Sequence, residues 1–241
     1  MSAAEADFSN VLAARADEAS LRKSDRTRLR LLSAIARELQ RGVARGELKV
    51  AAVADAAGVA HGTLYRYFPD LAGAVEALVE AFAGFVMARL RAARDGEPAS
   101  RARVAGVMLA YARLYRGNAG LMRCLVGLGE EESAFAASYA RLNREWYLRM
   151  AAAIARRRGI AGGGPGGDEQ AGVEAMLPVA YALGGMVDEF LAQVYLRREP
   201  ALAALGEDEA AVAALLTELW CLGADGAGNA GGAGGVGAGK A

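Results

Sequence analysis

The segment that most constrains the fold of this 241-residue chain lies near its amino end, where residues 53–68 read VADAAGVAHGTLYRYF. Apolar side chains recur at helical spacing from Val50 to Ala57, which predicts a short helix with one buried stripe. Gly58 can supply the left-handed backbone that closes a helix, and a second helix is predicted to begin near Ala60. Two short helices joined by so tight a turn form a helix-turn-helix.

The second predicted helix has one buried side and one polar side. Leu64 and Phe68 lie four residues apart and are expected to point inward. The outer faces offer hydrogen-bonding groups, one fixed positive charge and aromatic edges, with no acidic residue before Asp70, as suits a DNA-reading surface. An isolated amphipathic helix is more often a solvated surface helix, but the order of residues here favours DNA recognition. The outer residues are His61, Gly62, Thr63, Tyr65, Arg66 and Tyr67.

The pattern AGVAHGTLYRYF at residues 57–68, preceded by a basic helix and followed by a long helical region, resembles the tetracycline-repressor (TetR) family of transcriptional regulators. The specific part of this resemblance covers residues 29–78. It implies a homodimeric repressor whose two recognition helices enter successive major grooves of a palindromic operator in double-stranded DNA. It also implies an unidentified small-molecule effector that releases the repressor from DNA.

Matching the chain to the family's motif gives single residues a role in DNA binding. The positions that approach base edges are His61, Gly62 and Tyr65, and those that hold phosphates are Thr63, Arg66 and Tyr67. Lys49 stands where the family often has a threonine, and its charge could supply a phosphate contact instead. The chain departs from the family pattern at two further places. Ala60 stands where a capping serine is usual, and Leu71 stands where a phosphate-binding lysine is common.

The charge is unevenly distributed, although the formal net charge is zero. Residues 22–49 hold nine basic and three acidic side chains, whereas residues 167–241 hold three basic and eleven acidic ones. Both regions could be ordinary solvated faces. Because the basic region adjoins the helix-turn-helix, we expect it to face phosphates and the acidic end to point away from DNA.

The residue types needed for catalysis or metal binding are scarce. His61 is the sole histidine in the sequence and falls inside the proposed recognition helix, so we expect no histidine-dependent catalysis and no enzyme. Cys124 and Cys221 are too few and too far apart for a disulfide framework or a zinc site, so we expect no metal or cofactor. Carboxylate-only catalysis at Glu145, Asp188 or Glu189 stays open. Asp188 and Glu189 could also contact a ligand or an arginine across a dimer interface, but a solvent-facing pair is the preferred interpretation.

The chain lacks the pattern of an exported or membrane protein. No basic region followed by an apolar run opens the sequence, and the longest uncharged apolar stretch, residues 175–187, is short and rich in glycine. Together with the two cysteines, this predicts a cytoplasmic protein with no membrane partner.

Helical periodicity throughout predicts an all-α fold of four parts. Residues 1–20 form a flexible arm, 21–70 the helix-turn-helix domain, 71–222 a helical effector-binding and dimerisation domain, and 223–241 a disordered glycine-rich tail. The helix predicted over residues 71–94 connects the two folded parts. The last two long helices have apolar faces that suit a four-helix bundle between two subunits, or the core of a single subunit.

Aromatic and methionine side chains at helical spacing in the larger domain are candidate walls of an effector pocket, although such stripes are more often core. They are Tyr111, Tyr115, Phe135, Tyr139, Trp146, Met176 and Phe190. The expected function is a ligand-responsive transcriptional repressor. The alternatives are a DNA-binding regulator without an effector, and a helical ligand-binding or enzymatic protein that no longer recognises DNA.

Overall fold

The computed structural model describes residues 6–95, 100–129, 134–160 and 169–226, and every regular element in them is helical, as the sequence predicts. The amino-terminal elements are α2 (Phe8–Ala16), α3 (Lys23–Gln40), η1 (Arg45–Glu47), α4 (Val50–Ala57) and η2 (His61–Arg66). The long helices of the body are α5 (Leu71–Asp95), α6 (Arg101–Gly117), α7 (Ala119–Gly129), α8 (Ala134–Arg157), α9 (Glu169–Leu191) and α11 (Glu209–Asp225). Between α9 and α11 lie η3 (Ala192–Arg197), η4 (Pro200–Leu202) and α10 (Ala203–Gly206).

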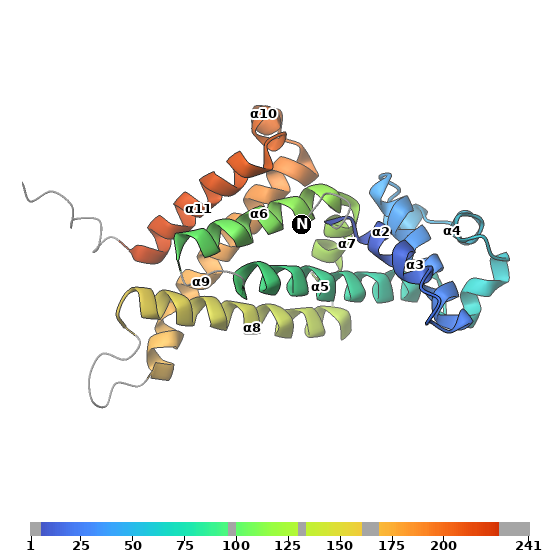
Figure 1. Cartoon of the computed structure of the whole chain (residues 1–241), viewed down its shortest axis with the longest axis horizontal. Coiled ribbons are helices and arrows are strands. Elements are labelled where there is room, and N and C mark those ends of the chain that lie inside the picture. Colours follow the sequence, from blue (N-terminus) through green and yellow to red (C-terminus); the bar gives the residue numbers. More distant parts are fainter. Residues whose placement is uncertain (1–5, 96–99, 130–133, 161–168, 227–241) are drawn as a thin grey trace, which may run out of the picture.

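The helices form a small group at one end of the molecule and a larger body (Figure 1). α3 and α4 lie in the small group, and α5 runs from it along the body. Within the body, α5 packs against α6 and α8, α8 packs along α9, and α11 lies against α6. This arrangement places the helix-turn-helix far from α11.

The core of the small group forms from the apolar stripe of α3. Leu32 and Ile35 are fully buried, and Val53 of α4 and Leu64 of η2 complete this core. Gly58 closes α4 with φ 66° and ψ 40°, which confirms the predicted left-handed glycine turn.

The expectation of a flexible arm over residues 1–20 is wrong for residues 8–16, which form helix α2. Asp7 caps this helix by accepting a hydrogen bond from the Ser9 backbone N–H at 2.8 Å. Phe8 and Leu12 are buried, and the centres of the Phe8 ring and the Phe85 ring on α5 lie 4.9 Å apart. α2 therefore bridges the small group and the body.

The connector α5 is the central helix of the body. The side chains of Val75, Leu78, Phe82 and Leu90 along it are buried. Among the described residues, α5 and the continuous helix Glu169–Arg197 have the length and hydropathy of a membrane span, but core helices of globular proteins commonly share those properties. The packing of α5 against α3, α6, α7 and α8 accounts for its apolar composition.

The carboxyl-terminal boundary differs slightly from the prediction. α11 continues to Asp225, so residues 223–225 are helical and do not belong to a disordered tail. Residues 227–241 of the predicted tail lie outside the described residues.

Candidate nucleic-acid interface and ligand cavity

The predicted recognition helix is a single 3₁₀-helix, η2. Ala60 precedes it in an extended conformation and supplies no side-chain capping bond, as expected from its methyl side chain. Leu64 and Phe68 are buried, so they attach the segment to α3 and α4. At six residues η2 is longer than most 3₁₀ runs, which seldom exceed about three or four residues.

The seven sequence-predicted DNA-binding residues lie at two places: Lys49 precedes α4, and the other six lie in η2 or directly after it. Two of the seven, Thr63 and Tyr67, are half-buried. The exposed ones are Lys49, His61, Gly62, Tyr65 and Arg66. Tyr65 leaves 58% of its surface exposed, which is unusual for a large aromatic side chain within a folded domain. The polar face of η2 is therefore open to a partner, while its apolar face is not.

Sequence reasoning missed an acidic neighbour of this surface. The Nε2 atom of His61 lies 3.1 Å from the Oδ1 atom of Asp55 on α4, and both side chains are exposed. The two residues meet across the turn at Gly58, so their proximity depends on its backbone geometry. Asp55 orients the His61 ring within the predicted base-reading surface.

The basic helix α3 borders the same surface. The Arg28 guanidinium lies 5.2 Å from the centre of the Phe68 ring, just beyond the end of η2. Arg30, farther along α3, lies 3.7 Å from a carboxylate oxygen of Asp17. Of these two arginines, Arg28 is the one the structure places beside the recognition segment.

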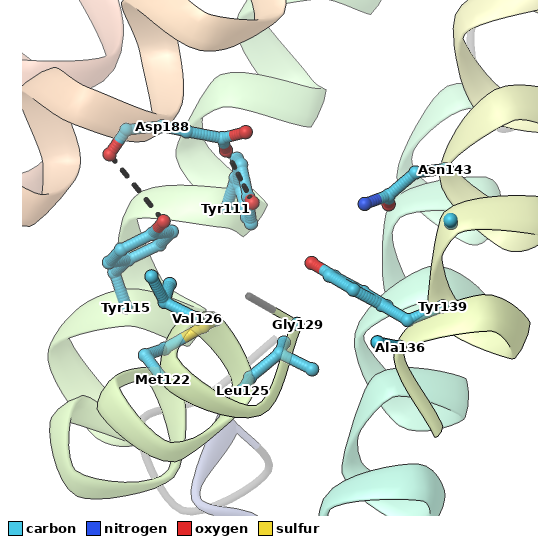
Figure 2. A pocket seen from close by; sticks show the side chains of 11 residues that line it. Tyr111, Tyr115, Met122, Leu125, Val126, Gly129, Ala136, Tyr139, Asn143 and Asp188 are labelled. Atoms are coloured by element: carbon cyan, nitrogen blue, oxygen red, sulfur yellow. Dashed lines mark hydrogen bonds between the residues drawn. The ribbon is translucent and has the colours of Figure 1, made fainter. Parts of the chain in front are cut away.

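A cavity of about 320 Å³ lies in the body between α6, α7, α8 and α9. Figure 2 shows Tyr111, Tyr115 and Asp188 on one side of it and Tyr139 and Asn143 on the other. Its walls are formed by Tyr111, Tyr115, Met122, Leu125, Val126, Gly129, Ala136, Tyr139, Ala140, Asn143 and Asp188. This volume is at the lower end of the range of small-molecule sites.

Three of the predicted wall residues, Tyr111, Tyr115 and Tyr139, line this cavity. Trp146, Met176 and Phe190 do not line it. The side chain of Phe135 lies outside the described part of the structure. All six described candidates belong to the hydrophobic core or pack against it, so the cavity wall and the core share the three tyrosines.

Asp188, interpreted from the sequence as a solvent-facing side chain, lies in the cavity wall. Its Oδ1 atom accepts a hydrogen bond from the Tyr111 hydroxyl at 2.7 Å, and its backbone oxygen accepts one from the Tyr115 hydroxyl at 3.5 Å (Figure 2). Burial raises the pKa of Asp188 to about 6, and the Tyr111 hydrogen bond offsets part of that increase.

The preferred interpretation of Asp188 and Glu189 as a solvent-facing pair is thus wrong for Asp188. Successive residues of a helix point about 100° apart, so one member turns inward while the other turns outward. Glu189 is exposed and pairs with Arg197 at 2.8 Å.

The tyrosines around Asp188 are uncharged hydrogen-bond donors. Burial, and to a lesser extent the Asp188 charge, raises the pKa of Tyr111 and Tyr115 well above the ordinary range. Burial likewise raises the pKa of Tyr139, and that of Tyr147 farther along α8. The Tyr111 and Tyr115 rings contact each other edge to face, with their centres 5.1 Å apart.

The described residues contain no cluster of three or more metal-ligating side chains. Cys124 is half-buried and Cys221 is buried, and both are free thiols. The cavity walls therefore offer hydroxyl, amide, carboxylate and apolar groups to a ligand.

Comparisons with known proteins agree with this geometry. Residues 31–78 match the family model of the bacterial regulatory proteins of the tetR family. A Rhodococcus sp. protein assigned to the TetR-family transcriptional regulators has a similar structure, with a TM-score of 0.53 and 21% identity over 80% of this chain and 95% of that one. The transcriptional regulator FadR from Bacillus subtilis, solved in complex with stearoyl-CoA, gives a TM-score of 0.53 and 18% identity over 81% and 98% of the two chains. No curated protein matches the sequence.

Proposed function

We propose that this protein, which has the fold of TetR-family regulators and carries that family's amino-terminal domain, is a dimeric cytoplasmic repressor that a small molecule releases from its operator. The observation that carries the proposal is the exposed polar face of η2, within the segment that matches the family. His61, Gly62 and Tyr65 would read base edges there, and Lys49, Thr63, Arg66 and Tyr67 would hold phosphates.

An apolar surface on the last two long helices supports a dimer. Tyr181 on α9 leaves 43% of its surface exposed, and Leu219 and Leu222 on α11 leave 40% and 61%. α9 and α11 contact each other, and exposed large apolar side chains on neighbouring helices suit a surface that a partner covers. Pairing α9 and α11 with their copies in a second subunit would form a four-helix bundle and provide two recognition segments for one operator.

The effector would occupy the cavity in the body, and α7 provides a path from there to the DNA-binding end. Met122, Leu125 and Val126 of α7 line the cavity, while Gly120 at its other end packs directly on the backbone of Leu39 in α3. A ligand that displaces α7, and with it the connector α5, would change the separation of the two recognition segments.

The proposal is tested by measuring binding of the full-length protein to DNA from upstream of its own gene, at several salt concentrations, with and without candidate ligands. We expect binding that weakens steeply with salt and is relieved by an effector. Acyl-CoA compounds belong among the candidates because the FadR relative was solved with stearoyl-CoA.

The alternatives give different results in the same experiment. Salt-sensitive DNA binding that no ligand changes would indicate a regulator without an effector. Ligand binding in the absence of DNA binding would indicate a ligand-binding or enzymatic protein that no longer recognises DNA.

A further inference from the structure

The cavity has one formally charged group among its described wall residues, the Asp188 carboxylate. The other walls are apolar or aromatic, apart from the neutral amide of Asn143. No lysine or arginine lines the described cavity, so its walls contain no group that would neutralise an anion.

The Asp188 carboxylate is only partly satisfied by the protein. Its Oδ1 atom accepts the Tyr111 hydroxyl, while for its Oδ2 atom the described residues provide neither a hydrogen bond nor an ion pair. Figure 2 shows this carboxyl group at the cavity wall facing Asn143 and Tyr139. Asp188 is half-buried and its second oxygen is open to the cavity without a protein counter-ion, so a cationic group in the cavity would gain an ion pair there.

The tyrosines around Asp188 also favour a positively charged ligand. Tyr111 and Tyr115 lie beside Asp188, and Tyr139 approaches from α8. All three are neutral at physiological pH, and burial raises the pKa of each phenol further above its ordinary value of 10.0. Aromatic rings attract cations through their negatively polarised faces, most strongly where water is excluded.

We propose that the ligand of this cavity is a small organic cation, an amine or a quaternary ammonium compound, whose charged group lies between Asp188 and the tyrosines. This inference rests on the proposed function in taking the cavity as the effector site. The volume of about 320 Å³ limits the ligand to a small molecule, and the single negative charge of the described walls matches a single positive one.

The test measures binding of choline and benzyltrimethylammonium to the full-length protein by calorimetry. Each is compared with its uncharged isostere, in which a tert-butyl group replaces the trimethylammonium group. We expect each ammonium compound to bind at least about tenfold more tightly than its isostere, because the two differ only in charge. No binding of either ammonium compound, or equal binding of compound and isostere, overturns the proposal.

Two variants locate the charge effect. Asp188→Asn keeps the shape of the side chain and removes its charge, so it is expected to abolish the preference for the ammonium form. Glu189→Gln removes the neighbouring carboxylate, which is exposed and paired with Arg197 outside the cavity, and should leave the preference intact. An unchanged preference in Asp188→Asn contradicts the proposal.

A pH series on the unmodified protein also tests whether ammonium binding depends on the charge of Asp188. Asp188 has a pKa of about 6, whereas Tyr111, Tyr115, Tyr139 and Tyr147 around it stay neutral because their pKa values are raised. Ammonium affinity should therefore fall as the pH is lowered through about 6 and Asp188 becomes protonated, while the affinity of the isostere stays constant. Parallel falls in both affinities, or constant values for both, count against the proposal.

DNA binding measured in parallel separates this inference from the proposed function. If upstream DNA binds but only a neutral or anionic compound releases it, the cation proposal fails and the repressor function stands. If ammonium compounds bind with the expected Asp188 dependence but DNA does not, the cavity assignment stands and the repressor function fails.

Discussion

At the scale of single residues, Asp188 makes folding stability depend on pH. Burial raises its pKa in the folded protein from 3.8 to about 6, so the folded state binds this proton more tightly than the unfolded state. The stability that protonated Asp188 contributes is complete below about pH 3.8 and is lost as the pH rises through about 6.

Asp188→Asn stays neutral throughout this range and does not undergo that loss. We expect its melting temperature, relative to that of the unmodified protein, to increase between about pH 4 and about pH 6 and then to level off. Thermal unfolding at a series of pH values, with Glu189→Gln as the control, measures this difference. A difference that is constant with pH would mean that Asp188 is not buried as described.

The same residue shows what sequence patterns do not reveal. Helical spacing indicates that either Asp188 or Glu189 can face inward, but it does not identify which one. That choice depends on Tyr111, which lies 77 positions away on α6 and donates to the carboxylate. By contrast, the turn at Gly58 was predictable because its backbone geometry depends on residues within the turn itself.

At the scale of helices, the close contact of α7 with α3 links the body to the proposed DNA-binding end. A methyl group at Gly120 would overlap the backbone of Leu39. Gly120→Ala should therefore force the two helices apart and lower the free energy of unfolding by about 1–3 kcal/mol. It should also change DNA affinity, since α3 forms the base of the recognition segment.

Gly127→Ala is the matched control for this prediction. Gly127 lies on the same helix, but a methyl group there would meet no atom within 4 Å. Alanine favours helix over glycine by about 1 kcal/mol, so this variant should be as stable as the unmodified protein or more so. Equal behaviour of the two variants in chemical denaturation would contradict the close packing of α7 on α3.

Helix α2 shows why one element was missed while its neighbours were predicted. α3, α4 and α5 each carry a long apolar stripe or a strong end signal in their own residues. α2 depends instead on Asn118, whose side chain accepts from the Phe8 backbone N–H at 2.9 Å and donates to the Ala6 carbonyl oxygen at 2.6 Å. These partners lie more than a hundred residues apart in sequence, so local periodicity does not indicate their contact.

At the scale of the whole molecule, the proposed repressor requires two copies of the chain. Leu222 is the most exposed large apolar residue among those described. Leu222→Glu places a charge on the proposed α9–α11 surface and is expected to shift a dimer to monomers, with weaker operator binding as a consequence. Glu199→Gln, an exposed change outside α9 and α11, is the control.

Sedimentation measurements over a range of protein concentrations determine the oligomeric state of these variants. Dimers of the Leu222→Glu variant as stable as those of the unmodified protein would place the interface elsewhere. A monomeric parent protein would remove the basis for two recognition segments on one operator.

The proposed repressor function depends on DNA binding by the exposed face of η2. The most direct test is the salt dependence of binding to upstream DNA for the unmodified protein, Arg66→Ala and Arg141→Ala, the last being an exposed arginine on α8. Arg66→Ala should weaken binding to all sequences and reduce the slope against the logarithm of salt concentration by about one, while Arg141→Ala should match the parent. Arg66→Ala with the parent's affinity and slope would contradict the assignment of η2 as the DNA-binding surface.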